Sequence, residues 1–257
     1  MLWYKTWVET RWRFLIGITL VACSALFLVF GYPYIVRLLA QLPADTRLHG
    51  LDGDLARRIH EAAGLAREFR GYVWAQGYHE NLSQLGTLFA VLLGTGGLLS
   101  HASGSAPLFT LSLPVSRERL LRVRAAAGLG QWFLIAIVPS LLIPLFAPMI
   151  GQSYGFGGAL VHGLCLFLAG AVFFSLALLL STAFGDLWRP LLLTLLVAGM
   201  LGVLEWFLPA RAGVFSVMSG EAYFRTGQPP WIGLLITSAL SAALLYGAQR
   251  EFARRDF

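Results

Sequence analysis

Charged side chains are scarce in this sequence. Only 12% of its 257 residues are Asp, Glu, Lys or Arg, whereas 57% are hydrophobic, and the mean hydropathy is +0.70. This composition excludes an ordinary soluble domain. The apolar residues occur in long continuous runs rather than in short alternating stretches, which excludes a membrane β-barrel. The sequence therefore predicts an all-α, polytopic membrane protein.

Residues and motifs that carry chemistry are also few. The two cysteines, Cys23 and Cys165, lie inside apolar runs and have no CxxC partner, so we interpret both as packing residues. No HExxH, GxSxG or metal-spaced cluster occurs. A protease pairing of Ser103 with His162 is excluded because the predicted topology places them on opposite sides of the membrane. We expect no catalysis and no metal site.

The apolar runs predict six transmembrane helices. Each run is long enough, at about 1.5 Å per residue, to cross a hydrocarbon core of about 30 Å. The first lacks a cleavage site and should remain as an anchor, and Pro139 with Pro144 should bend or unwind the third. The predicted spans are residues 14–36, 82–100, 127–148, 157–180, 190–208 and 231–249.

The distribution of Lys and Arg predicts the orientation, because positive residues resist translocation. Both termini are expected in the cytoplasm, so that residues 37–81 form an extracytoplasmic loop and residues 107–126 a cytoplasmic loop. The cytoplasmic cations would then be Lys5, Arg11, Arg13, Arg117, Arg119, Arg122, Arg124, Arg189, Arg250, Arg254 and Arg255.

Three flanking segments have a helical pattern. Residues 1–13 carry an aromatic face opposite a polar face, which predicts an amphipathic helix in the inner interface; the alternative is an aromatic belt at the start of the first span. Residues 54–73 predict an external amphipathic helix that caps a path or packs on the outer ends of the spans. Residues 209–231 predict one or two short helices that dip into the outer leaflet.

Polar and small residues inside the spans are the remaining candidates. His162 and Glu205 lie near the outer ends of their spans, where they could reach interfacial water or pair with Arg211, and we expect structural roles for both. Small residues recur every four positions and predict close helix packing, within one chain or across a dimer. They are Gly86, Ala90, Gly94, Ala239, Ala243 and Gly247.

The cytoplasmic loop holds an unusual charge cluster. Pro114 ends the preceding segment, Ser116 can cap a new helix, and Glu118 suits the first turn of that helix. The pattern leaves Arg117, Arg119, Arg122 and Arg124 facing the cytoplasm or the lipid headgroups. Such a segment either anchors the chain by the positive-inside rule or docks a soluble partner.

The stretch FTLSLPVSRERLLRVRA, after the second span, resembles a signature of type-2 ABC exporter permeases. The amphipathic YKTWVETRWRFLIG, the run PLFAPMIGQSY, the loop STAFGDLWRP and the closing REFARRDF align in the same order. The resemblance covers essentially the whole chain. It implies a single permease domain over residues 1–257, with six spans, in a bacterial plasma membrane.

The resemblance also implies partners and a site. Two permease copies would form a dimer in the lipid bilayer and bind two separate cytoplasmic ATPase subunits, which hold the ATP and Mg²⁺. This chain would bind no cofactor and no nucleic acid, and it has no phosphate-binding loop of its own. The coupling helix that docks into the ATPase would comprise Pro114, Ser116, Arg117, Glu118, Arg119 and Leu120.

Two hypotheses of different classes follow. In the first, the chain is the permease of an ATP-driven exporter. No charged residue deep in the spans indicates an ion as the substrate, and the aromatic, apolar spans fit an amphiphile. In the second, it is a non-transporting membrane scaffold or sensor that recruits a soluble ATPase or another partner through the same loop.

Overall fold

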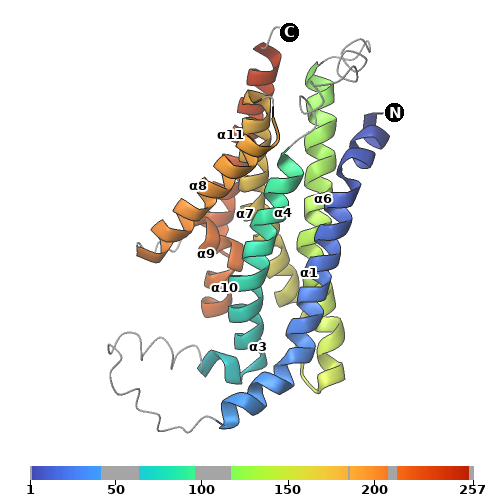
Figure 1. Ribbon diagram of the computed structural model, residues 1–257. Helices are drawn as coiled ribbons and strands as arrows, with labels where there is room; N and C mark the ends of the chain where they lie inside the picture. Colours follow the sequence, from blue (N-terminus) through green and yellow to red (C-terminus); the bar gives the residue numbers. More distant parts are fainter. Residues whose placement is uncertain (1, 42–63, 96–116, 185, 208–212, 255–257) are drawn as a thin grey trace.

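Helices pack side by side along most of the described chain (Figure 1). The structure is a computed structural model that describes residues 2–41, 64–95, 117–184, 186–207 and 213–254, and these ranges contain no β-strand. The first described helix begins, and the last one ends, at the same end of the molecule, which we call the terminal end (Figure 1).

Among the described residues, five helices are long and apolar enough to span a membrane. The protein is therefore a multi-pass membrane protein. These helices are α1 (Leu2–Gln41), α6 (Arg117–Phe146) with the 3-10 turn η2 (Ala147–Ile150), α7 (Phe156–Ala183), α8 (Trp188–Phe207) and α11 (Trp231–Arg254). The shorter elements are α3 (Phe69–Tyr72), the π-helix η1 (Val73–Leu82), α4 (Ser83–Gly94), α9 (Val214–Ser219) and α10 (Glu221–Thr226).

Helix α7 lies at the centre of the molecule. It packs against α4, α6, α8, α9 and α11, and 16 of its 28 residues are buried. Small and hydroxyl side chains allow its neighbours to approach: the Ser175 Oγ lies 2.7 Å from the Ser241 Oγ of α11. Trp132 of α6 is fully buried, and its indole nitrogen donates to the Phe167 carbonyl over 2.9 Å. By contrast, α8 leans away from the bundle (Figure 1).

The N-terminal segment is not the separate interfacial helix that we predicted. Its residues form the first turns of α1 and run into the first predicted span without a break, because residues 2–16 contain no Gly or Pro; α1 then continues through Pro33 to Gln41. The polar residues Glu9 and Thr10 are turned inward, whereas Trp3 and Trp12 are 58% and 65% exposed. This is the arrangement that the alternative, an aromatic belt at the start of a span, requires.

The predicted external helix is interrupted in its described part. Residues 42–63 lie outside the described ranges. Glu68 has an extended backbone, with φ −96° and ψ 131°, and from Phe69 the chain is helical as far as Gly94. Phe69 and Val73 are buried in the main core rather than on a separate helix. The helix that includes α4 thus begins well before the predicted position 82.

A π-helical stretch joins α3 to α4. Val73, Tyr78 and Leu82, spaced by five and four residues, are almost completely buried. An α-helix repeats every 3.6 residues, so the wider π-turn is what places all three on one face. The Ser83 hydroxyl donates to the Tyr78 carbonyl, five residues earlier, over 2.6 Å.

The remaining elements are close to expectation. α6 stays helical through Pro139 and Pro144 and tightens to a 3-10 turn only at Ala147, so the predicted unwinding does not occur at Pro139. Two short helices, α9 and α10, lie between α8 and α11, as the sequence predicts. Val217 and Met218 of α9 are buried in the core.

Candidate functional site: a charged cluster at the terminal end

Three helices meet at the terminal end of the molecule. The start of α1, the end of α4 and the start of α6 pack against one another there (Figure 1). Their facing side chains are polar and charged, although all three helices are apolar further along. We call the group formed by Glu9, Arg13, Thr95 and Arg124 the terminal cluster.

Arg124 lies at the centre of the terminal cluster. Its side chain is only 7% exposed, and its guanidinium lies 3.7 Å from the Glu9 carboxylate of α1. It also donates to the main-chain carbonyl of Thr95, directly after α4, over 3.4 Å. The prediction that Arg124 faces the cytoplasm or the headgroups is therefore wrong: the side chain points into the protein because Glu9 and the end of α4 supply partners there.

Arg13 completes the contact between α1 and α4. Its guanidinium donates to the carbonyl oxygens of Leu92 and Thr95, over 2.9 and 2.7 Å. The last carbonyl groups of a helix have no partner within the helix and carry a partial negative charge. Two arginines from two other helices therefore satisfy and neutralise the C-terminal end of α4.

Hydrogen bonds extend the cluster deeper between α1 and α6. The Gln131 amide donates to the Thr10 hydroxyl over 2.8 Å, and Thr10 donates to the Thr6 carbonyl over 2.9 Å. Both residues are buried. Among the described residues, the Nε of Arg124 and the Oε1 of Gln131 have no hydrogen-bond partner although both atoms are buried.

The cluster carries more positive than negative charge. Glu9 faces Arg124 on one side and Lys5, over 3.9 Å, on the other. Arg13 adds a further positive charge close to Arg124. The negative end of α4 supplies the balancing partial charge, which makes the position of α4 part of the electrostatics of the cluster.

The described members of the predicted coupling helix, which begin at Arg117, lie next to this cluster at the start of α6. Pro114 and Ser116 are outside the described ranges, and α6 begins at Arg117. Glu118 is in the first turn of α6, and Glu118 and Arg119 are exposed, while Leu120 is half-buried against the core. The first turn of α6 thus presents charges outward, and one face of the next turn places Arg124 against α1 and the end of α4.

The exposed arginine of the second turn contrasts with Arg124. Arg122 pairs with Glu118 over 3.5 Å, and both side chains are more than 60% exposed. Two residues further along, α6 has turned by about 200°, so Arg124 faces the opposite way. Only one of these two neighbouring arginines joins helices together.

His162 lies in a second polar group at the opposite end of the bundle. It is 2% exposed, so the predicted access to interfacial water is absent. Its Nδ1 lies 3.1 Å from the Ser219 carbonyl, and its ring stacks on Tyr78 at 4.6 Å and contacts the edge of Tyr223. These contacts give His162 a structural role between α7, η1 and the α9–α10 segment.

Glu205 holds the start of α9. Its carboxylate accepts hydrogen bonds from the main-chain amides of Phe215 and Ser216, and each N–O distance is 3.1 Å. A carboxylate at a helix N-terminus satisfies free amides and complements the helix dipole. The proposed pairing with Arg211 falls outside the described residues.

An aromatic group lies beside this end of the bundle. Phe224 of α10 stacks on Trp74 at 4.4 Å, and the guanidinium of Arg70 lies 5.7 Å from its ring centroid. Tyr154, in the loop before α7, contacts the edge of Phe69 at 6.1 Å. Burial raises the pKa of Tyr154, with Arg70 acting in the opposite direction, so this phenol stays protonated near neutral pH.

The two predicted ladders of small residues are placed differently. In α4, Gly86, Ala90 and Gly94 are buried, and α4 packs against α7. In α11, Ala239 and Ala243 are exposed and Gly247 is half-buried. The buried face of α11 carries Gly233, Thr237 and Ser241 instead; Ser241 contacts α7, and Gly233 lies against Val217 of α9.

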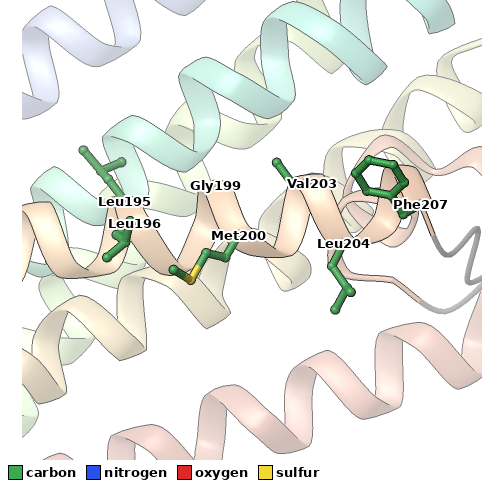
Figure 2. A pocket seen from close by; sticks show the side chains of 7 residues that line it. All are labelled: Leu195, Leu196, Gly199, Met200, Val203, Leu204 and Phe207. Atoms are coloured by element: carbon green, nitrogen blue, oxygen red, sulfur yellow. The ribbon is translucent and has the colours of Figure 1, made fainter.

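A shallow apolar groove follows the exposed side of α8 (Figure 2). Its lining contains no charged side chain, and its centre is Gly199. The lining residues are Leu195, Leu196, Gly199, Met200, Val203, Leu204 and Phe207. A surface of this kind is what a membrane-spanning helix presents to lipid.

No family model matches the chain, and no curated protein or solved structure matches it. Within the ranges that the structure describes, no group of three or more His, Cys, Asp or Glu side chains is placed to hold a metal ion.

Proposed function

We propose that this chain is the permease subunit of an ATP-binding-cassette exporter in a bacterial plasma membrane. Its six spans would comprise the five long helices and the helical run from Phe69 to Gly94, with both termini in the cytoplasm. Two permease copies would assemble with separate ATPase subunits, which bind ATP and Mg²⁺ and supply the energy.

The observation that carries the proposal is the placement of the first two turns of α6. The first turn presents Glu118 and Arg119 outward at the terminal end. The second turn binds α1 and α4 through Arg124. A soluble ATPase that grips the exposed turn would thus act on three helices at once.

This arrangement favours docking over simple anchoring. Scattered arginines in contact with headgroups would satisfy the positive-inside rule, with no need for a buried ion pair behind them. Charged groups on a rigid helical turn offer a partner both a defined shape and electrostatic complementarity. A switch between inward- and outward-facing packings then requires only that the ATPase bind one packing more tightly.

The test is charge reversal in the docking turn. We expect Arg117→Glu with Arg119→Glu to abolish assembly with the copurifying ATPase, or to abolish ATP hydrolysis by the complex, because repulsion replaces attraction across the interface. Arg250→Glu is the matched control: Arg250 is exposed near the end of α11, at the same end of the molecule, and should leave assembly and hydrolysis unchanged.

The outcomes separate the alternatives. Normal assembly and ATP hydrolysis by the doubly reversed variant would contradict the docking assignment. A wild-type complex that assembles with an ATPase in proteoliposomes but never couples hydrolysis to transport would indicate the recruiting scaffold or sensor instead.

A further inference from the structure

We propose that Glu9 and Arg124 are positioning residues that make the start of α6, the start of α1 and the end of α4 move as one unit. This inference rests on the proposed function, because it explains how movement of the docking turn would reach the spans. The structural part of it, the joining of three helices by one buried guanidinium, can be tested on the permease alone.

Arg124 points into the protein, whereas its neighbour Arg122 points outward. Its side chain is 7% exposed, against 62% for Arg122 on the same helix. The carboxylate of Glu9 and the carbonyl of Thr95 come from two different segments, and both contact this one guanidinium. Arg124 is therefore the point at which the docking helix is joined to both neighbours.

Separation of Arg124 from Glu9 would cost free energy. A buried charge that loses its partner keeps its desolvation penalty without the compensating attraction, so breaking a buried pair is strongly unfavourable. Purely apolar helix contacts inside a membrane can slide with little cost, since lipid tails are as apolar as the side chains. The ion pair thus resists a movement of α6 relative to α1 that apolar contacts would allow.

The end of α4 is held by two arginines. Arg13 donates to the carbonyls of Leu92 and Thr95, and Arg124 shares the Thr95 carbonyl. If α4 moved away, both guanidinium groups would lose acceptors, and the Thr95 carbonyl would lose both arginine donors. The end of α4 therefore follows α1 and α6.

The experiment measures the distance between α1 and α6 in lipid nanodiscs by pulsed electron paramagnetic resonance. Spin labels are attached at Val8→Cys and Ala126→Cys, both exposed positions, after Cys23→Ser and Cys165→Ala remove the native thiols. Labelled chains are diluted with unlabelled permease, so that only the two labels within one chain are measured even in a dimer, and we expect one narrow distance distribution for this background. Arg124→Gln and Glu9→Gln should each broaden or shift it.

Two further variants distinguish positioning from general damage. Arg124→Lys keeps the positive charge and should give the narrow distribution again. If the Arg124 side chain only occupied volume, Arg124→Gln would give the narrow distribution as well. Arg122→Gln removes an exposed arginine two residues away and should leave the distribution unchanged. If Arg124→Gln and Glu9→Gln both kept the narrow distribution, the proposal would be overturned.

A second measurement connects the unit to coupling. In the complex with its copurifying ATPase, Arg124→Gln should retain assembly but lose most of the ATP hydrolysis, and Arg124→Lys should regain it. A wild-type hydrolysis rate in assembled Arg124→Gln would overturn the transmission role. A different result would contradict the proposed function, namely intact assembly and ATP hydrolysis after charge reversal of Arg117 and Arg119. That result would not affect the distance measurement, which uses the permease alone.

Discussion

Replacement of Gly94 by alanine tests how closely α4 packs on α7. Gly94 is the last residue of α4. A Cβ atom at this position would collide with the main-chain carbonyl of Phe174 and lie 2.9 Å from the Cβ of Ala177. Neither atom can rotate away, because one belongs to the backbone and the other is attached directly to it. The two helices would have to separate.

The expected magnitude combines two opposing effects. Overpacking of a close contact costs about 1–3 kcal/mol, and the rigid neighbours place Gly94→Ala in the upper part of that range. Alanine recovers up to about 1 kcal/mol of helix propensity, and less at the end of a helix. We expect a net loss of about 1–2 kcal/mol, which corresponds to a fall in Tm of about 2–8 °C.

Gly130→Ala is the matched control for this prediction. Gly130 is also on a long helix, α6, but it is exposed and no atom lies within 4 Å of the position of its Cβ. The substitution should therefore show only the propensity gain, up to about 1 kcal/mol. The two glycine replacements are predicted to shift stability in opposite directions.

The buried thiol of Cys165 provides the assay. Cys165 is buried and Cys23 is exposed, so in a Cys23→Ser background a thiol-reactive dye labels the protein only as it unfolds. The midpoint of dye fluorescence on heating gives an apparent Tm. If Gly94→Ala raised this midpoint as much as Gly130→Ala does, the inferred collision with Phe174 would be refuted.

Two further predictions concern α9 and the topology. Glu205→Gln leaves one acceptor oxygen for the amides of Phe215 and Ser216, so it should cost about 1–2 kcal/mol in the same assay; an unchanged midpoint would contradict the capping role. For orientation, a membrane-impermeant maleimide should label Ser153→Cys in intact cells but Arg122→Cys only after permeabilisation, and the reverse pattern would contradict a cytoplasmic N-terminus.

The helix limits were largely predictable where the apolar runs are isolated. Predicted spans at 157–180, 190–208 and 231–249 correspond to α7, α8 and the greater part of α11. A helix is the structure that satisfies all backbone hydrogen bonds of a single segment within lipid. The limits of such helices therefore follow from where the apolar residues stop, without reference to the rest of the chain.

The terminal cluster was not predictable in the same way. Arg122 and Arg124 occur in one run of cations next to a span, and both satisfy the rule that such cations face the membrane surface. The difference between them depends on Glu9 and on the end of α4, which are far away in sequence. The one available signal was the acidic Glu9 on the polar face of the N-terminal segment.

The two small-residue ladders show the same limit. Gly86, Ala90 and Gly94 lie on the buried face of α4, whereas Ala239 and Ala243 lie on the exposed face of α11. Small residues at four-residue spacing predict a helix face that another helix can approach closely. The spacing does not predict whether another helix of the same chain covers that face.

The sequence by itself determined that this is a helical, multi-pass membrane protein. Backbone hydrogen bonds close within each helix, so local apolarity is sufficient to specify it. The tertiary structure decided which faces turn inward: Arg124 and His162 are buried because partners on other helices compensate the loss of water. Such compensation comes from residues distant in sequence, and only the folded arrangement brings them together.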